Sequence, residues 1–185
     1  MGQQLTLRDA RDQYFETTGF TEASYQDTWL KLPIGRFNVY LPSPPSRRRC
    51  IARHDLHHVL TGYGTNWVGE FEMSAWEVGA GCGNYWFAWM INTQSVMVGA
   101  IPYWSKLLTA FSRGRRSRSL YHEPTIDNLL DRPIDELRAR LELAPDDVEP
   151  TTRERVAFAV YVLTPWVLAL GLGAAAIALA AKLLF

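Results

Sequence analysis

The sequence predicts an all-α fold, in which a compact helical domain is followed by a C-terminal hydrophobic helix. Segments that begin with a capping residue and end with glycine or proline recur along the chain. A long aromatic and apolar segment occupies residues 84–111, and the last thirty residues carry a single charged side chain, Lys182. We therefore divide the chain into a helical domain at residues 1–145, a linker at 146–155 and a membrane anchor at 156–185.

The domain is expected to begin with two helices. Residues 6–19 combine Thr6 as a helix cap with an acidic residue three positions later, and a glycine ends the pattern. Residues 21–35 repeat this pattern with Thr21 as the cap. Three closely spaced prolines then exclude a helix and predict an extended segment in residues 36–46.

The middle of the domain is also predicted to be helical. One helix covers about residues 46–60, and the next begins at Thr65 or Asn66 after a glycine-rich turn. Four polar side chains interrupt the long segment of residues 84–111, which favours a core or ligand-lining helix over a second membrane span. Pro102 is expected to kink this helix.

Two shorter features are expected before the linker. Residues 112–119 are predicted to be a basic loop. A short helix follows in residues 131–143, with Asp131 as its cap and an ion pair between Glu136 and Arg140.

The C-terminal segment is long enough to cross a membrane. About 20 apolar residues span a bilayer as a helix, and residues 166–184 alone come close to that length. Arg153 and Arg155 precede the segment, and positive residues favour the cytoplasmic side. We therefore expect the domain to lie on the cytoplasmic face of a bacterial inner membrane. A buried core helix, or a membrane-surface hairpin broken at Pro165, is the alternative.

Composition excludes some functions and favours a reducing compartment. The chain has 19 basic and 19 acidic residues, so no excess of positive charge predicts a nucleic-acid partner. Cys50 and Cys82 are far apart without metal-type spacing, and we interpret them as free thiols. The polar and partly acidic start of the chain does not resemble a signal peptide, which favours a cytoplasmic location.

A cluster of histidines predicts a metal site. His54 and His58 are four positions apart and share one face of a helix, which Asp55 can join, while Glu70 would return from the next helix. Two imidazoles with one or two carboxylates suit zinc, iron or manganese and leave coordination positions open. His57 is expected beside the ligands or at the surface. The alternative for the whole cluster is a set of solvated polar side chains on a helix surface.

The sequence H-D-x-x-H followed by eleven residues and a glutamate resembles the signature of one family, the fourth member of the Coq series of ubiquinone-biosynthesis proteins. The later stretches "AFSRGRRSRSL" and "RPIDELRARLEL" are also similar to that family, and the resemblance covers residues 47–143. It implies a helical fold and a divalent ion bound by His54, Asp55, His58 and Glu70. Zinc is the first choice for this ion, with iron, manganese or magnesium as alternatives.

The resemblance also implies a function. Members of the family bind a polyprenyl chain, associate with membranes and with other quinone-biosynthesis enzymes, and are implicated in C1 decarboxylation and hydroxylation of a polyprenyl-hydroxybenzoate. A non-catalytic scaffold that binds the prenylated lipid is the alternative, and a metal-dependent hydrolase is a third. The family is usually peripheral, whereas this chain carries an apparent transmembrane segment. A homodimer is left open.

Further residues are candidates for substrate and membrane contacts. Glu77 follows Glu70 by seven positions and would be a catalytic base or a surface carboxylate. An apolar stripe would line a lipid tunnel or pack in the core, and it consists of Trp86, Trp89, Met90 and Met97. Basic residues of the predicted loop would contact anionic lipids or remain solvated, and these are Arg113, Arg115, Arg116 and Arg118.

Overall fold

The computed structural model describes residues 4–34 and 36–184, and within these it confirms the all-α fold class. The helices are α1 (Leu7–Thr18), α2 (Pro45–Thr61), α3 (Trp67–Ala80), α4 (Trp86–Arg115), α5 (Ile134–Arg140) and α6 (Thr152–Leu184). A small antiparallel hairpin joins β1 (Trp29–Ile34) to β2 (Phe37–Pro42). Short 3₁₀ turns are η1 (Glu22–Gln26), η2 (Leu120–His122) and η3 (Asp127–Leu129).

The first predicted helix is confirmed, and the second is wrong. In α1, the Thr6 side chain accepts the backbone N–H of Asp9, and Gly19 ends the helix in the left-handed conformation. After Thr21, only the 3₁₀ turn η1 forms, and residues 29–34 are a strand paired with β2. The helical conformation is disfavoured before Pro33, and pairing with β2 satisfies the backbone hydrogen bonds of this segment.

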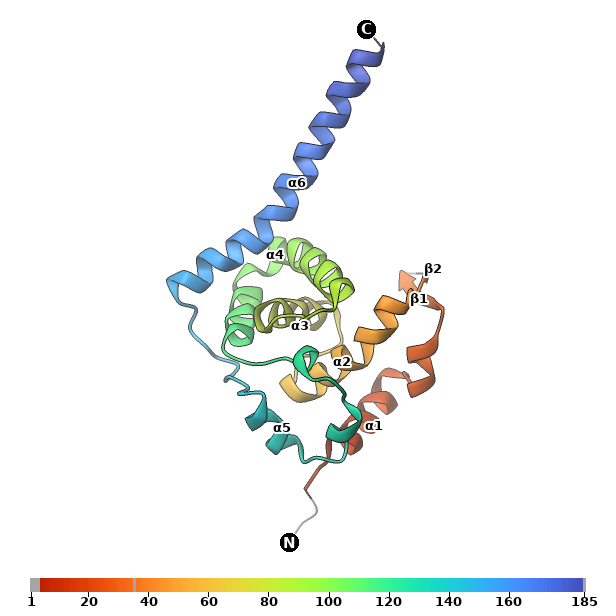
Figure 1. The fold of residues 1–185 in the computed structure, drawn as a ribbon, viewed down its shortest axis with the longest axis vertical. Coiled ribbons are helices and arrows are strands. Elements are labelled where there is room, and N and C mark those ends of the chain that lie inside the picture. The colour runs from red at the N-terminus through yellow and green to blue at the C-terminus, as the bar shows by residue number, and fades with distance from the viewer. Residues whose placement is uncertain (1–3, 35, 185) are drawn as a thin grey trace.

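Helices α3 and α4 form the centre of the domain, and they pack together closely (Figure 1). Two glycines make this approach possible. A Cβ on Gly79 would lie 2.2 Å from the carbonyl oxygen of Phe111, and a Cβ on Gly114 would lie 2.1 Å from that of Trp76. The predicted kink after Pro102 is confirmed, because Tyr103 departs from helical geometry. Helix α4 continues to Arg115, so the first half of the predicted basic loop is helical.

The core has two main parts that meet at α2 and α3. One part packs α3, α4 and the start of α6 around Trp76, Phe111 and Phe158. The other packs α1, α2 and α5, and Leu7, Leu56 and Leu137 are among its buried residues. Polar side chains of α2 and α3 lie between the two parts, and the candidate site described below is built from them.

The short helix α5 forms as predicted, but its cap and ion pair differ. Pro133 rather than Asp131 occupies the cap position, because the Asp131 carboxylate pairs with Arg8 of α1 at 2.8 Å. Glu136 pairs with Arg132, which precedes the helix, while Arg140 reaches Glu123. The charges of α5 are therefore used partly to attach it to neighbouring segments.

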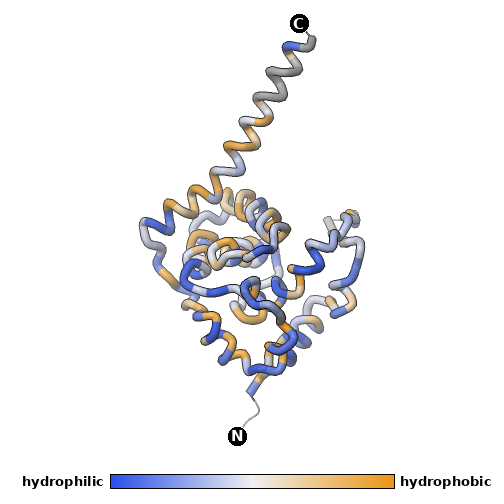
Figure 2. Tube along the Cα trace, in the orientation of Figure 1, coloured by the Kyte–Doolittle hydropathy of each residue, from blue (hydrophilic) through white to orange (hydrophobic). Residues whose placement is uncertain are grey.

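Helix α6 has a docked part and a projecting part. It begins at Thr152, before the predicted start of the anchor, and Phe158 and Val162 are buried against the domain. Beyond these residues the helix leaves the body of the molecule (Figure 1), and much of its course is hydrophobic (Figure 2). It is long and apolar enough to cross a membrane. Residues 163–184 would extend about 33 Å as a helix, close to the roughly 30 Å of a bilayer core.

Candidate metal centre

Two histidines of α2 and a glutamate of α3 converge as a group that could hold a metal ion. These residues are His54, His58 and Glu70, and one ligand atom from each lies within 4.8 Å of the others. The Nε2 atoms of the two histidines are 3.2 Å apart, and the Glu70 carboxylate lies 3.3 Å from His54 Nε2 and 3.6 Å from His58 Nε2. The four-residue spacing on α2 and the turn before α3 produce this convergence, as the sequence predicted.

The second nitrogen of His58 fixes the proton of its ring. His58 Nδ1 lies 3.0 Å from the carbonyl oxygen of Tyr63. A carbonyl oxygen only accepts hydrogen bonds, so Nδ1 must carry the proton and donate it. The other ring nitrogen, Nε2, is then directed to the centre of the group.

His54 is oriented in the same way by a different acceptor. Its Nδ1 lies 3.1 Å from Oε1 of Glu77, a side chain of α3 that is fully buried. The carboxylate accepts the Nδ1 proton, so Nε2 is the nitrogen that faces His58 and Glu70. A carboxylate or a carbonyl oxygen behind each histidine is the usual support of a protein metal site, because it fixes the ring and increases its basicity.

Glu77 contacts His54 and not the open side of the group, so the predicted role as a catalytic base does not fit its position. Its two oxygens also accept hydrogen bonds from His57, from the Tyr121 hydroxyl at 3.1 Å and from Asn92 Nδ2. An ionised carboxylate offers about four acceptor sites, and four side chains occupy them. Burial would raise the pKa of Glu77, but these histidines hold it well below its ordinary value.

His57 is buried behind the group and is not a ligand. Its Nε2 accepts the backbone N–H of Leu120 at 2.8 Å, so its proton lies on Nδ1 and is donated to Glu77 at 2.6 Å. Burial lowers the pKa of His57, which agrees with a neutral ring. His57 therefore connects α2 to η2 and helps to hold Glu77 in place.

The donor set of the group could hold a cation at its centre. Two acceptors, His58 Nε2 and the Glu70 carboxylate, face His54 Nε2. A proton on His54 Nε2 could be donated to only one of them, whereas a metal ion could bind all three groups. Two imidazole nitrogens bound to one tetrahedral zinc ion at about 2.0–2.1 Å would lie about 3.3 Å apart, close to the 3.2 Å found here. The three residues therefore fit a divalent ion with at least one open coordination position.

The pKa values of His54 and Glu70 also favour positive charge in the group. Burial lowers the pKa of His54, but the carboxylates of Glu77 and Glu70 outweigh burial and hold it well above its ordinary value. Burial raises the pKa of Glu70, but hydrogen bonds from His54 and His58 lower it to about 2. The site therefore attracts positive charge, whether a proton or a metal ion supplies it.

Asp55 does not join the other three predicted ligands. Its carboxyl is buried beside the phenol rings of Tyr14 and Tyr25, so it faces α1 and η1. Burial raises the pKa of Asp55. Adjacent residues on a helix point about 100° apart. Because the His54 side chain points to Glu70, the Asp55 side chain points away from the group.

One side of the group is open. The Glu70 side chain is 39% exposed, whereas that of His58 is 1% exposed. The ring of Tyr14 stacks on that of His58 with 6.1 Å between centroids and 22° between planes. A ligand would therefore approach past Glu70, with Tyr14 of α1 beside it.

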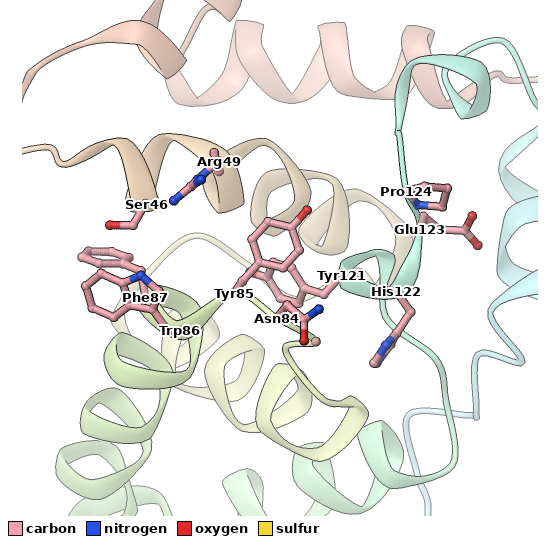
Figure 3. A pocket seen from close by; sticks show the side chains of 11 residues that line it. Ser46, Arg49, Asn84, Tyr85, Trp86, Phe87, Tyr121, His122, Glu123 and Pro124 are labelled. Atoms are coloured by element: carbon pink, nitrogen blue, oxygen red, sulfur yellow. The ribbon is translucent and has the colours of Figure 1, made fainter.

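The predicted lipid-binding residues do not enclose a tunnel beside these ligands. Trp86 and Met90 are exposed on α4, while Trp89 stacks on Tyr161 of α6 and Met97 is partly buried. Trp86 also lines a cavity of about 530 Å³ between the start of α2, the start of α4 and η2 (Figure 3). The other three predicted residues are not among those that line this cavity.

The predicted anion contacts are only partly available. Arg113 is buried, where it donates to the carbonyl oxygens of Thr61 and Ala144, so it cannot reach a lipid head group. Arg116 pairs with Glu154 at the start of α6. Arg115 is exposed.

The structure adds residues that the sequence did not indicate as parts of the site. Asn92 and Tyr121 hold Glu77, and the carbonyl oxygen of Tyr63 holds His58. The signal for Asn92 was its polarity within an apolar helix. Neither Tyr121 nor a backbone carbonyl has such a signal, because their positions depend on how η2 and the α2–α3 turn pack.

Comparison with models of protein families, with curated proteins and with solved structures found no match to this chain.

Proposed function

We propose that this chain is a membrane-anchored, metal-dependent protein of quinone biosynthesis that acts on a polyprenylated aromatic acid. The reaction proposed is removal of the C1 carboxyl group as CO₂, with a hydroxyl group taking its place when molecular oxygen and a two-electron reductant are supplied. The observation that carries the proposal is the convergence of His54, His58 and Glu70 with both histidine rings fixed from behind.

The proposed substrate matches two features of the chain. A ring with a carboxylate and a hydroxyl group carries oxygen ligands for the open side of the site. A polyprenyl tail partitions into a membrane, and α6 would hold the domain at its surface.

A bound divalent ion would polarise the carboxylate and phenolate oxygens of the substrate. The protein residues would position the ring and hold the ligands. Tyr14 lies beside the entrance and offers a flat surface to an aromatic ring. Glu77 keeps His54 oriented throughout, since all its acceptor sites are in use.

The experiment starts with metal analysis of the full-length protein purified without chelator. The metal-loaded protein is then incubated with a prenylated hydroxybenzoate, with and without oxygen and a reductant, and products are detected by mass spectrometry. We expect loss of the carboxyl group with the wild-type protein. We expect no product with His58→Ala and normal turnover with Glu72→Gln, because Glu72 is outside both the metal-binding group and the residues that line the cavity.

The absence of product from fully metallated wild-type protein would overturn the enzymatic proposal. The absence of bound metal would overturn the metal site itself.

A non-catalytic lipid-binding scaffold is the second candidate. It is favoured by the position of the 530 Å³ cavity, which is not lined by His54, His58 or Glu70. A scaffold with a structural metal would bind the prenylated lipid and partner enzymes without turnover. It would also keep that binding in a His58→Ala variant that remains folded.

A further inference from the structure

Helix α4 has one long face that is apolar, uncharged and uncovered by the domain. Between Trp86 and Ser105 it has no acidic or basic side chain. Its buried residues face α3, and examples are Ala88, Asn92 and Val96. The opposite side, here called the outer face, consists of Met90, Ile91, Gln94, Val98 and Ile101.

The exposure of this face is large for apolar side chains. Val98 is 50% exposed and Ile101 is 73% exposed. Contiguous apolar surface of this kind usually contacts another molecule or a membrane. A helix whose exposed side lacks charge over about five turns is unusual in water, where charged residues normally occupy the solvent side.

The outer face lies next to the place where α6 leaves the domain. Trp104 of α4 packs edge-on against Phe158 of α6 with 4.9 Å between ring centroids, and Trp89 stacks on Tyr161 at 6.5 Å. Residues 163–174 of α6 are not part of the core, and all of them except Pro165 are exposed. Figure 1 shows the projecting part of α6 rising from the side of the body on which α4 lies.

Both helices carry a tryptophan that is partly exposed near this junction. Trp104 and Trp166 are both partly exposed, at 41% and 36%. Tryptophan favours the boundary between the hydrocarbon and the head groups of a bilayer. Trp104 packs against Phe158, about two helical turns before Trp166, so this end of α4 lies beside the part of α6 that leads into the projecting part.

We propose that the outer face of α4 lies in the interfacial layer of the same membrane that α6 crosses, so that the domain is attached at two places. This inference rests on α6 as the anchor, as proposed above. Continuity with α6 favours a bilayer over a second copy of the chain as the partner. Contact along α4 would fix the orientation of the domain, which a single anchoring helix would leave free to tilt.

The test measures membrane depth with spin labels on the full-length protein in lipid nanodiscs. Single cysteines are introduced by Val98→Cys and Ile101→Cys on the outer face, by Leu170→Cys on α6 and by Asn128→Cys on η3 as the water-exposed control. The natural Cys50 and Cys82 are buried, and burial raises the pKa of the Cys50 thiol to about 11. Labelling of the wild-type protein gives their background, and circular dichroism shows that each variant is folded.

Each label is exposed to oxygen, which concentrates in lipid, and to a water-soluble nickel complex. We expect labels at positions 98, 101 and 170 to be reached several-fold more by oxygen than by nickel, and the label at 128 to show the reverse. If 170 is in lipid while 98 and 101 are as accessible to nickel as 128, the anchor stands and this inference is wrong. If the label at 170 is also accessible to nickel, α6 is not a membrane anchor and the contact through α4 is wrong as well.

A second copy of the chain on the outer face would give a different result. Labels at 98 and 101 would then be shielded from both oxygen and nickel. Their spectra would show spin–spin broadening that disappears when labelled protein is diluted with unlabelled protein. That outcome would also overturn the membrane contact.

Discussion

Glu77 is the residue on which the geometry of the candidate site depends most. It holds the ligand His54 and also connects His57, Asn92 and Tyr121, so side chains of three helices and of η2 meet at one buried carboxylate. A buried carboxylate is stable only when its acceptor sites are filled. The same hydrogen bonds that make it stable also keep it ionised and unable to take up a substrate proton.

Replacing the Glu77 carboxylate by an amide should lower metal affinity, because Glu77 orients the ligand His54. In Glu77→Gln, an NH₂ group replaces one acceptor oxygen and faces donors. We expect metal affinity to fall about 10- to 100-fold, as for other residues that support a ligand, and thermal stability to fall as well. Competition with a coloured chelator measures the affinity. The control Glu72→Gln lies on the same helix and should leave affinity unchanged, and equal affinities for both variants would contradict the role of Glu77.

The raised pKa of His54 predicts a pH dependence of metal binding. A proton and a metal ion compete for His54 Nε2, so apparent affinity should fall as pH decreases through the raised pKa, by up to about tenfold per pH unit for one displaced proton. The metal-free protein behaves oppositely: protonated His54 stabilises its fold at low pH, and this contribution is lost as pH rises through the raised pKa.

The difference in melting temperature between metal-loaded and metal-free protein should therefore increase with pH. Thermal unfolding at several pH values above and below neutrality measures this difference. A difference that stays constant with pH would show that no proton is displaced from His54.

At the scale of elements, the close approach of α3 and α4 determines where Glu70 and Glu77 lie. Both glutamates are on α3, which is held between α2 and α4, and the contact with α4 depends on two glycines. Any side chain at these positions would push α3 and α4 apart and shift both carboxylates relative to the histidines of α2.

The variant Gly114→Ala should therefore be destabilised. Its new methyl group would lie 2.1 Å from the carbonyl oxygen of Trp76 unless the helices separate, and overpacking of this kind costs about 1–3 kcal/mol. Gly171→Ala is the control, because nothing lies within 4 Å of that position on α6. Chemical unfolding in mild detergent, followed by tryptophan fluorescence, compares the two. Equal midpoints would show that α3 and α4 have room for a methyl group.

At the scale of the whole molecule, α6 belongs both to the domain and to the proposed anchor. Phe158 and Val162 complete the core that contains Trp76 and Phe111. Removal of all residues from 156 onward would therefore damage the domain itself. A chain that stops after Leu163 keeps the docked part and loses only the projecting part.

We expect this shortened chain to fold, to bind metal and to be extracted from membranes by alkaline carbonate, whereas the full chain should resist extraction. The reason is that the removed part of the helix, residues 164–184, is long enough to cross the bilayer core, while contact through α4 alone would be reversible. Membrane fractionation with metal analysis of the soluble fraction measures both outcomes. A shortened chain that still resists carbonate would show that another segment anchors the protein.

The sequence by itself determined the features that depend on local chemistry. Caps and glycines predicted α1, α2 and α3, Pro102 predicted the kink, and the spacing of His54 and His58 on one helix predicted two members of the candidate metal group. Glu70 followed from the expectation that two helices joined by a short turn run back along each other. These predictions hold because helical periodicity and helix ends depend on residues that are near in sequence.

Only the tertiary structure decided the features that depend on contacts between distant segments. It turned Asp55 toward Tyr14 and Tyr25, placed Glu77 behind His54, buried Arg113, and paired residues 29–34 with β2 instead of forming a helix. It also divided α6 into a docked and a projecting part. In each case the position of a side chain or backbone group depends on a partner far away in the sequence, and the pattern of neighbouring residues does not specify that partner.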